Sequence, residues 1–269
     1  MKRFFALMIA MMLTLCLTAC GGGGSDSDLA YVKDKGTLVV GITDFAPMDY
    51  RSDSGEWVGF DADMAKAYAE SLGVDVEFIE ITWSQKAVEL ETKAIDVVWN
   101  GMTITDEVKG LMGVSNPYCK NAQVVVLGVD AAGDLSQGGS LKAMNAASDL
   151  SALSFAVEDG SAGAAALDAE GISYTAVLDQ STALMEVASG SVDACVIDLL
   201  MAGAMIGEGT SYPDLVIAVE LAGEEYGVGF RKGSDLIENF NAFYKAAYEA
   251  GTVMDCAETY GIAKTIIAQ

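Results

Sequence analysis

The sequence predicts an α/β protein of two lobes, in which parallel-rich β-sheets carry flanking helices and two strands form a hinge. Three observations support this fold class. Apolar segments typical of strands alternate with amphipathic segments typical of helices, a pattern that indicates βαβ units and parallel sheets. The second half of the chain repeats this alternation. Two further apolar segments, 123–127 and 215–219, are the expected strands that link the halves.

The first half of the chain contains three expected strands with two helices between them. Asp61 has a side chain suited to cap the first helix, and Gly73 is suited to end it. Ser84 is the expected cap of the second helix. The strands are 37–43, 74–81 and 95–98, and the helices are 61–72 and 84–93.

The second half has the same pattern and ends in two helices. Its expected strands are 153–157, 174–178 and 192–197, and its helices are 161–169, 181–189, 235–250 and 253–260. Residues 130–149 are rich in Gly, Ser, Ala and Asp and are expected to be a loop. With the linking strands at 123–127 and 215–219, residues 128–216 form a lobe inserted into another lobe, made of 31–127 and 217–269.

The N-terminus predicts export. Two basic residues precede an apolar run, 4–17, which indicates a signal peptide rather than a membrane-spanning helix. The ending Leu-Thr-Ala-Cys20 resembles the cleavage box of bacterial lipoproteins, in which the Cys carries the lipid. We expect a signal peptide at 1–19, and a lipidated Cys20 with a flexible tether at 20–30 that anchors the protein outside the cytoplasm to the bacterial cell membrane. An ordinary secretory signal with an incidental Cys is the alternative.

Composition excludes several functions. A formal net charge of -24 makes nucleic acids and anionic membrane surfaces poor partners. The chain has no His, so His-based catalysis and His metal sites are excluded. Cys119, Cys195 and Cys256 lack C-x-x-C spacing, which argues against a structural zinc site, and one disulfide among them is left open. We expect no metal, no cofactor and a monomer.

Seven short motifs occur in the order found in one family of binding proteins. They lie at 36–44, 59–65, 94–96, 101–105, 115–118, 190–194 with Asp198, and 226–232. With these motifs the chain resembles the extracytoplasmic solute-binding proteins of bacterial ABC importers, in family 3, the polar amino acid type. The resemblance implies a two-lobed periplasmic-binding-protein-like fold of type II. It also implies that the lobes close on a small polar solute, an amino acid or cationic amine, for delivery to an ABC permease.

The resemblance also assigns ligand-binding roles to polar and aromatic residues. Asp198 matches the position whose carboxylate holds the ligand ammonium, although it is also placed to cap a helix that starts near Leu199. Asp44 follows the first strand and matches a common pocket position. Phe45 and Trp83 match positions where an aromatic ring lies against the ligand, and each is alternatively a plain core residue.

Backbone groups supply the rest of the site that the resemblance implies. Gly101, Met102 and Thr103 match a stretch whose backbone and hydroxyl groups hold the ligand. Ser161 and Ala162 match the start of a helix whose N–H groups face the ligand carboxylate, and a helix N-terminus suits an anion without any side chain.

One departure from the family pattern concerns the ligand carboxylate. Family members that bind α-amino acids carry an Arg five residues after the Thr at position 103, and this chain has Val108 there, with Lys109 next. Glu158 adds another carboxylate near the expected pocket. We therefore hypothesise a cationic ligand, or one whose carboxylate is held by backbone N–H groups and Lys109. Alternatively, Arg51 or Lys86 replaces the missing Arg.

Three function classes fit these observations. A binding module for import needs no catalytic groups, and we expect no enzyme. A dehydratase on the same scaffold would need a general acid, for which Glu158 or Asp198 with a raised pKa could serve. A sensor domain would need a membrane helix or a further domain after residue 261, which we do not expect.

Overall fold

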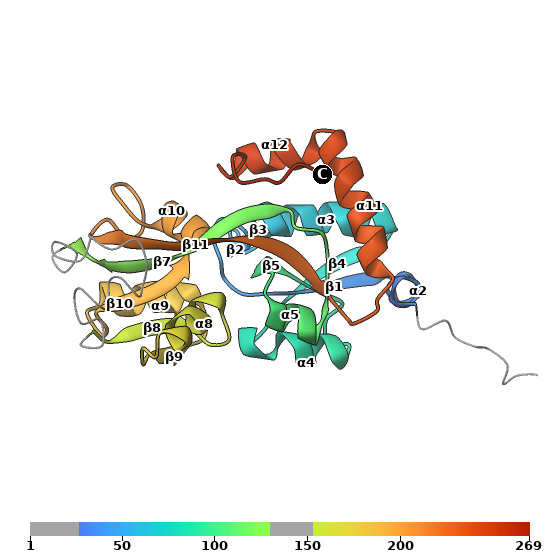
Figure 1. Cartoon of the computed structure of the whole chain (residues 1–269). Helices are drawn as coiled ribbons and strands as arrows, with labels where there is room; N and C mark the ends of the chain where they lie inside the picture. The colour runs from blue at the N-terminus through green and yellow to red at the C-terminus, as the bar shows by residue number, and fades with distance from the viewer. Residues whose placement is uncertain (1–26, 130–152) are drawn as a thin grey trace, which may run out of the picture.

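A computed structural model describes residues 27–129 and 153–269 (Figure 1). The predicted signal peptide, Cys20, most of the predicted tether and the predicted loop at 130–149 lie outside the described residues. The fold is α/β with parallel-rich sheet regions and flanking helices, as the sequence predicts. Within the described ranges, no helix combines the length and the apolar character needed to cross a membrane.

One nine-stranded sheet runs through the molecule (Figure 1). Its order is β4 (Asp75–Glu80), β1 (Thr37–Ile42), β5 (Val97–Thr103), β11 (Leu215–Phe230), β7 (Cys119–Gly128), β10 (Ala194–Asp198), β8 (Phe155–Glu158) and β9 (Thr175–Val177), with β6 (Gly113–Val114) paired to β11. The pairs at both ends of the sheet are parallel, whereas β11 and β7 make antiparallel pairs in its middle. A separate hairpin joins β2 (Tyr50–Arg51) and β3 (Trp57–Val58).

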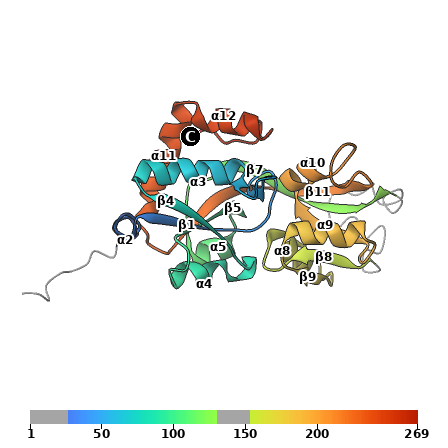
Figure 2. The same cartoon turned by 180° about the vertical axis from the view of Figure 1, so that it is seen from behind.

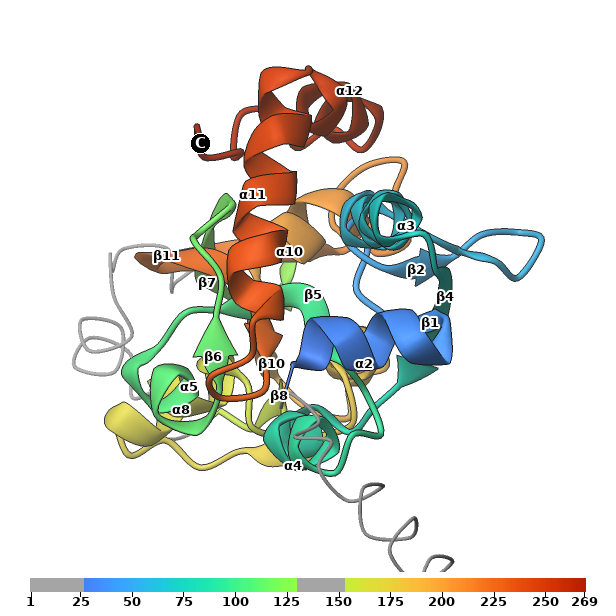
Figure 3. The same cartoon turned by 90° about the vertical axis from the view of Figure 1, so that its right-hand side faces the viewer.

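The first lobe contains the sheet end at β4 and the helices on both of its faces. These helices are α2 (Asp28–Lys35), α3 (Phe60–Leu72), α4 (Lys86–Glu91), α5 (Asp106–Leu111), α11 (Leu236–Glu249) and α12 (Thr252–Thr259), with a 3-10 helix at Trp83–Gln85. Helices α3 and α11 cover one face, and α4 and α5 lie at the other (Figure 3). Successive side chains of a strand point to opposite faces of the sheet, so one strand can pack against helices on both faces. Val40 packs in the core under α3, and its neighbour Val39 packs in the core on the other face with Leu90 of α4.

The second lobe is smaller and follows the same rule. Its helices are α8 (Ala162–Ala169), α9 (Gln180–Ala188) and α10 (Leu199–Met205). Helix α8 packs through Leu167 with Val196 of β10, whereas α9 packs through Leu184 in the core that contains the next residue of β10, Ile197. The two lobes lie side by side (Figures 1 and 2).

Strands β7 and β11 connect the lobes. They are paired from Leu215 opposite Gly128 to Tyr226 opposite Cys119, so both strands run through both lobes. The predicted linking strands, 123–127 and 215–219, are the second-lobe parts of this ladder. Two register shifts interrupt the pairing, one of them between Glu220 and Gly223. A bulge of this kind bends and twists a strand. This bulge lies in the part of β11 that connects the two lobes.

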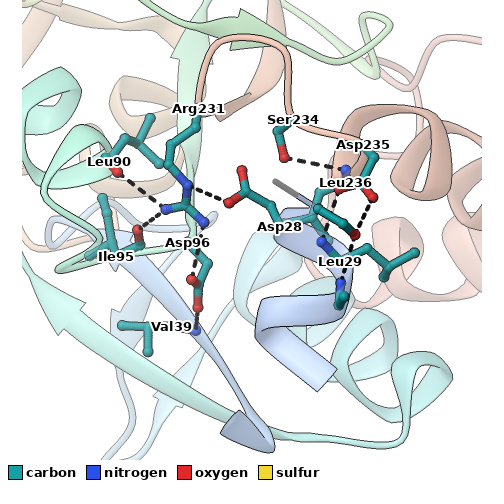
Figure 4. A network of polar contacts seen from close by, with 12 residues as sticks. Asp28, Leu29, Val39, Leu90, Ile95, Asp96, Arg231, Ser234, Asp235 and Leu236 are labelled. Atoms are coloured by element: carbon teal, nitrogen blue, oxygen red, sulfur yellow. Dashed lines mark hydrogen bonds and ion pairs between the residues drawn. The ribbon is translucent and has the colours of Figure 1, made fainter. Parts of the chain in front are cut away.

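Helix α2 begins at Asp28, so residues 28–30 are helical rather than part of the predicted tether. The reason is a polar network that fixes the start of the helix (Figure 4). Arg231 Nε donates to Asp28 Oδ1 at 2.8 Å, and its other nitrogens reach Asp96 and two backbone carbonyls. Asp235 accepts hydrogen bonds from the Leu29 N–H and the Ser27 hydroxyl. The sequence pattern carries no sign of these contacts, because their partners lie far apart in the chain.

Two predicted helix caps are wrong. Gly59 is the N-cap of α3, and the Asp61 side chain instead accepts hydrogen bonds from the Gly101 N–H at 2.7 Å and the Tyr118 hydroxyl at 2.7 Å. Ser84 lies inside the 3-10 helix, and the α-helix begins after it at Lys86. A polar side chain that suits a cap is also suited to other unpaired backbone donors, so tertiary structure decides its partner. The cysteines Cys119, Cys195 and Cys256 are free thiols.

Candidate functional site

A cavity of about 60 Å³ lies between the two lobes. Its lining comes from both lobes: Thr43, Phe45, Trp83, Lys86, Asn100, Gly101, Met102, Thr103, Thr105, Glu107, Val108, Leu111, Glu158, Gly160, Ser161, Ala162, Ala165, Gln180 and Asp198. One water needs on the order of 10–15 Å³ on this scale, so the cavity holds several waters or one small solute.

Every predicted binding residue except Asp44 lines this cavity. Asp44 follows β1, as predicted, but its half-buried carboxyl is directed elsewhere, near Asp179 and Glu80 of the two lobes. Burial and these two acidic neighbours raise its pKa. The Asp44 carbonyl oxygen accepts a hydrogen bond from the Ser181 hydroxyl at 3.3 Å, which makes the residue a contact between lobes.

Two buried aromatic residues form the apolar wall on the first lobe. Phe45 is in edge-to-face contact with Tyr226, with ring centroids 6.3 Å apart. Gly101 permits this packing, because a Cβ there would lie 2.5 Å from the Phe45 ring and its φ is +54°. Trp83 lines the same cavity and carries the Lys86 ammonium 4.6 Å from its ring centroid. Such walls supply apolar area for the stem of a ligand.

Some of the predicted ligand donors are already engaged within the protein. The Gly101 N–H donates to Asp61, and the Thr103 hydroxyl donates to Glu224 Oε1 at 2.9 Å. The Thr103 oxygen keeps its lone pairs, so it can still accept a hydrogen bond. These residues therefore shape the cavity more than they donate into it.

Asp198 is buried at the base of the cavity. Its Oδ1 accepts hydrogen bonds from Asn121 at 2.5 Å, Gln123 at 3.0 Å and the Tyr226 hydroxyl at 2.5 Å, and its Oδ2 accepts one from Gln180. The side chain makes no capping bond to α10, although the residue occupies the N-cap position, so the expected capping contact is absent.

The Asp198 carboxyl shares its hydrogen-bond donors with a carboxyl group on one of the strands that connect the lobes. Glu224 lies on β11, and its Oε1 accepts from Asn121 at 2.7 Å and from Gln123 at 2.8 Å, the same two amides that bind Asp198. Both amides belong to β7, so the two hinge strands share this network. Burial, and next the charge of Glu224, raise the pKa of Asp198 to about 8.

Glu158 ends β8 and lines the cavity from the second lobe. The side chain is 2% exposed, and among the described residues its Oε1 has no hydrogen-bond partner. Burial raises its pKa well above the usual range, and Asp198 and Asp179 raise it further, while Lys86 lowers it. A buried carboxyl with an unpartnered oxygen is costly, so a donor from a ligand, or a proton, stabilises it.

Lys86 brings a cation to the cavity from the first lobe. Its Nζ donates to the Trp83 carbonyl at 3.2 Å and to the Gly160 carbonyl at 3.1 Å, and the second bond crosses between the lobes. The residue is 8% exposed, and burial lowers the pKa of its ammonium, whereas Glu158 raises it.

Helix α8 starts at the cavity wall, as predicted. The Ser161 hydroxyl caps the helix by accepting from the Ala164 N–H at 3.1 Å. Within the described part of the chain, no hydrogen bond satisfies the N–H groups of Ala162 and Gly163. These donors and the helix dipole favour an anion at this point.

Val108 occupies the position where the resemblance predicts an Arg that binds the ligand carboxylate. Val108 is buried and lines the cavity, so an Arg at this position would reach it. Lys109 is exposed and lines a different surface depression, and Arg51 lies over the Trp57 ring at 3.9 Å. Of the cations considered as replacements, Lys86 lines the cavity, and Lys109 and Arg51 do not.

Several lining residues were not predicted from the sequence. Thr43, Asn100 and Gln180 hold their neighbours in place through side-chain hydrogen bonds. Thr43, Asn100 and Gly160 each adjoin a predicted site residue in the chain, which is a signal that could have found them. Gln180 carries no comparable signal, because tertiary packing alone brings it to the cavity.

Two lobes joined by paired strands, with a small polar cavity between them, are the architecture of bacterial solute-binding proteins. The chain belongs to the bacterial extracellular solute-binding proteins, family 3, whose profile matches residues 38–263.

The relatives it is similar to include proteins with different ligands. The arginine-binding extracellular protein ArtP of Bacillus subtilis (strain 168) is 27% identical over 258 residues, 93% of this chain and 94% of ArtP. The L-cystine-binding protein TcyJ of Escherichia coli (strain K12) is 28% identical over 233 residues, 85% of this chain and 84% of TcyJ. A mutant ArgBP from T. maritima has a crystal structure with a TM-score of 0.78 and 32% identity, covering 87% of this chain and 99% of that chain.

Proposed function

We propose that this protein captures one amino acid, or a related amine, between its lobes and delivers it to the permease of an ABC importer. One observation carries the proposal: a small cavity between the lobes is lined by two buried carboxyl groups, the exposed Glu107, one ammonium and the start of a helix. These groups complement the two charged ends of an amino acid.

The charge of the cavity favours a ligand with an additional positive group. Three acidic residues, Glu107, Glu158 and Asp198, line the cavity with one basic residue, Lys86. The Arg expected for a ligand carboxylate is replaced by Val108. Arginine, named for ArtP and ArgBP, is therefore the first candidate, and histidine and the polyamines follow. L-cystine, named for TcyJ, has two ammonium and two carboxylate groups and is the comparison ligand without a net positive charge.

Residues 31–127 with 217–269 and residues 128–216 serve in this proposal as the lobes that move relative to each other. Contacts between the lobes, such as Lys86 to Gly160 and Ser181 to Asp44, support a closed form. Ligand contacts to both lobes would favour this form over an open one, which is hinge closure.

A thermal-shift screen followed by calorimetry tests the proposal. At least one amino acid or amine should raise Tm and bind with 1:1 stoichiometry, because a ligand of the folded state stabilises it by mass action. Ala162→Trp should abolish binding by filling the cavity, and Ala169→Trp on the exposed part of the same helix should not. A folded protein that binds no member of the panel contradicts the proposal.

The lipid anchor is a separate part of the proposal, and it rests on the sequence around Cys20. Cells that express the full chain should incorporate a clickable palmitate analogue into it. Cys20→Ser should remove the label and release the protein from the membrane fraction. Equal labelling of the wild type and the variant would contradict lipidation at this residue.

A dehydratase is the alternative function, and Glu158 is the observation in its favour. A carboxyl whose pKa is raised by burial can act as a general acid near neutral pH. Incubation with prephenate decides between the functions: we expect no product, and turnover that Glu158→Gln abolishes would establish the enzyme.

A further inference from the structure

Lys86 and Glu158 are oppositely charged residues that line the same cavity without forming an ion pair. Lys86 comes from α4 of the first lobe and Glu158 from β8 of the second. Among residues 27–129 and 153–269, no carboxylate oxygen lies within 4.0 Å of the Lys86 ammonium. Both side chains are more than nine-tenths buried. Buried charges are normally paired, so this arrangement requires an explanation.

The hydrogen-bonding capacity of Lys86 is incompletely used. An ammonium has three donors, and the Trp83 and Gly160 carbonyls accept two of them. The Gly160 carbonyl lies one residue before the cap of α8, which places the ammonium beside the helix start. There, the Ala162 and Gly163 N–H groups lack partners among the residues that the structure describes. One remaining ammonium donor and two amides at one place form a site for a carboxylate.

The Glu158 carboxyl has more unused hydrogen-bond acceptor sites than the Asp198 carboxyl. The Asp198 oxygens accept four hydrogen bonds from protein groups, which nearly fills the lone pairs of a carboxylate. Within residues 27–129 and 153–269, Glu158 Oε1 has no hydrogen-bond partner. A cationic group of a ligand therefore finds more acceptor capacity at Glu158 than at Asp198.

We propose that Lys86 and Glu158 are the two specificity-determining ends of the binding site: Lys86 and the start of α8 hold the ligand carboxylate, and Glu158 holds a cationic group of the ligand. This assignment rests on the proposed function. It gives Lys86 the task that an Arg at position 108 would perform. It also explains why an ammonium and a carboxyl group with unused hydrogen-bonding capacity are buried in one cavity, because a zwitterionic ligand between them satisfies both.

Matched ligand pairs test the role of Lys86. L-arginine and agmatine differ only in the carboxylate, as do L-histidine and histamine. Calorimetry should show that the wild type prefers the amino acid of a pair by at least about thirtyfold, the size expected for a buried charge-assisted contact. Lys86→Met should reduce this preference to within about threefold, whereas Lys109→Met, at an exposed position outside the cavity, should leave it unchanged.

A rescue experiment separates a binding role from a structural one. The double variant Lys86→Met with Val108→Arg should regain the preference for the amino acid, because an Arg at position 108 also reaches the cavity. A Lys86→Met protein that keeps the full preference would overturn the assignment. So would a variant that loses affinity equally for both members of a pair.

Glu158 is tested by removing its charge at constant shape. Glu158→Gln should weaken L-arginine binding by at least about tenfold, and Asp159→Asn, at the exposed neighbouring residue, should not. Unchanged arginine affinity in Glu158→Gln would refute the role of Glu158. If the wild type binds no member of the amino acid and amine panel, the proposed function itself fails. If it binds a panel member but none of these probes, or if it binds the probes and the variants behave like the wild type, only this assignment fails.

Discussion

Replacing Gly160 with Ala adds a single atom, a Cβ, at the contact between the two lobes. Gly160 has a φ of +69°, and a Cβ built there lies 2.9 Å from both Cα and Cβ of Ser84, which belongs to the other lobe. Because one of these atoms is backbone, no side-chain rotation relieves the contact. The lobes must move apart, which lengthens the hydrogen bond from Lys86 to the Gly160 carbonyl.

The expected magnitude has two parts. An Ala in the left-handed region costs about 1–2 kcal/mol in the open and the closed form alike, so this part lowers stability without affecting binding. The contact with Ser84 acts only when the lobes meet. A hydrogen bond from a charged donor contributes about 1.5–3 kcal/mol, and its loss in the closed form alone weakens ligand binding by roughly 10- to 100-fold.

Gly171→Ala is the matched control. Gly171 lies in the same lobe with a φ of +66°, and a Cβ there meets nothing within 4 Å. Calorimetry should therefore show weakened ligand binding in Gly160→Ala only, while urea denaturation shows a similar loss of stability in both variants. Equal ligand affinities in the two variants would refute the claim that the contact of Gly160 with Ser84 belongs to the closed form.

Three further predictions concern charge. Arg231→Met should lower the free energy of unfolding by about 3–5 kcal/mol, because Asp28 loses the cation that pairs with it. The variant should keep the ligand affinity of the wild type, and a drop in affinity measured by calorimetry would contradict this. Burial raises the pKa of Glu158 well above its usual range, and a cation bound there favours the ionised form. Affinity for L-arginine should therefore rise between pH 6 and 8.5, and pH-independent affinity would contradict a cation at this carboxyl. Burial raises the pKa of Asp61 from 3.8 to about 7, so the contribution of this carboxyl to stability is complete below pH 3.8 and is lost as pH rises to about 7. In urea denaturation, Asp61→Asn should therefore lose less stability than the wild type between pH 5 and 8. Parallel losses in the two proteins would contradict this.

The sequence predicts the fold well where local patterns carry the information. Strand β1 and helix α8 lie within a residue or two of the predicted bounds, because apolar periodicity and a Ser cap define them locally. Helix α2 was not predicted, since its start depends on Arg231 and Asp235 from the far end of the chain. Helix α5 was missed as well, because it is short and offers few periodic positions.

The candidate site was predicted mainly through residues next to strand ends and helix starts. These positions lead to the cavity for Phe45, Thr103 and Ser161. Asp44 shows the limit of such reasoning: it has the right position in the chain, but its carboxyl is among charges outside the cavity. The hydrogen bonds that occupy Asp198 and the unpartnered oxygen of Glu158 depend on tertiary packing, so the pattern cannot rank these two carboxyl groups.

A crystal structure of the protein with the amino acid that raises its Tm most is the most direct test of binding between the lobes. The ligand should lie between Trp83 of the first lobe and Ala162 of the second, with a cationic group within about 3 Å of a carboxylate oxygen of Glu158 or Asp198. A ligand bound at any other place on the molecule, with this cavity free of it, would contradict the account.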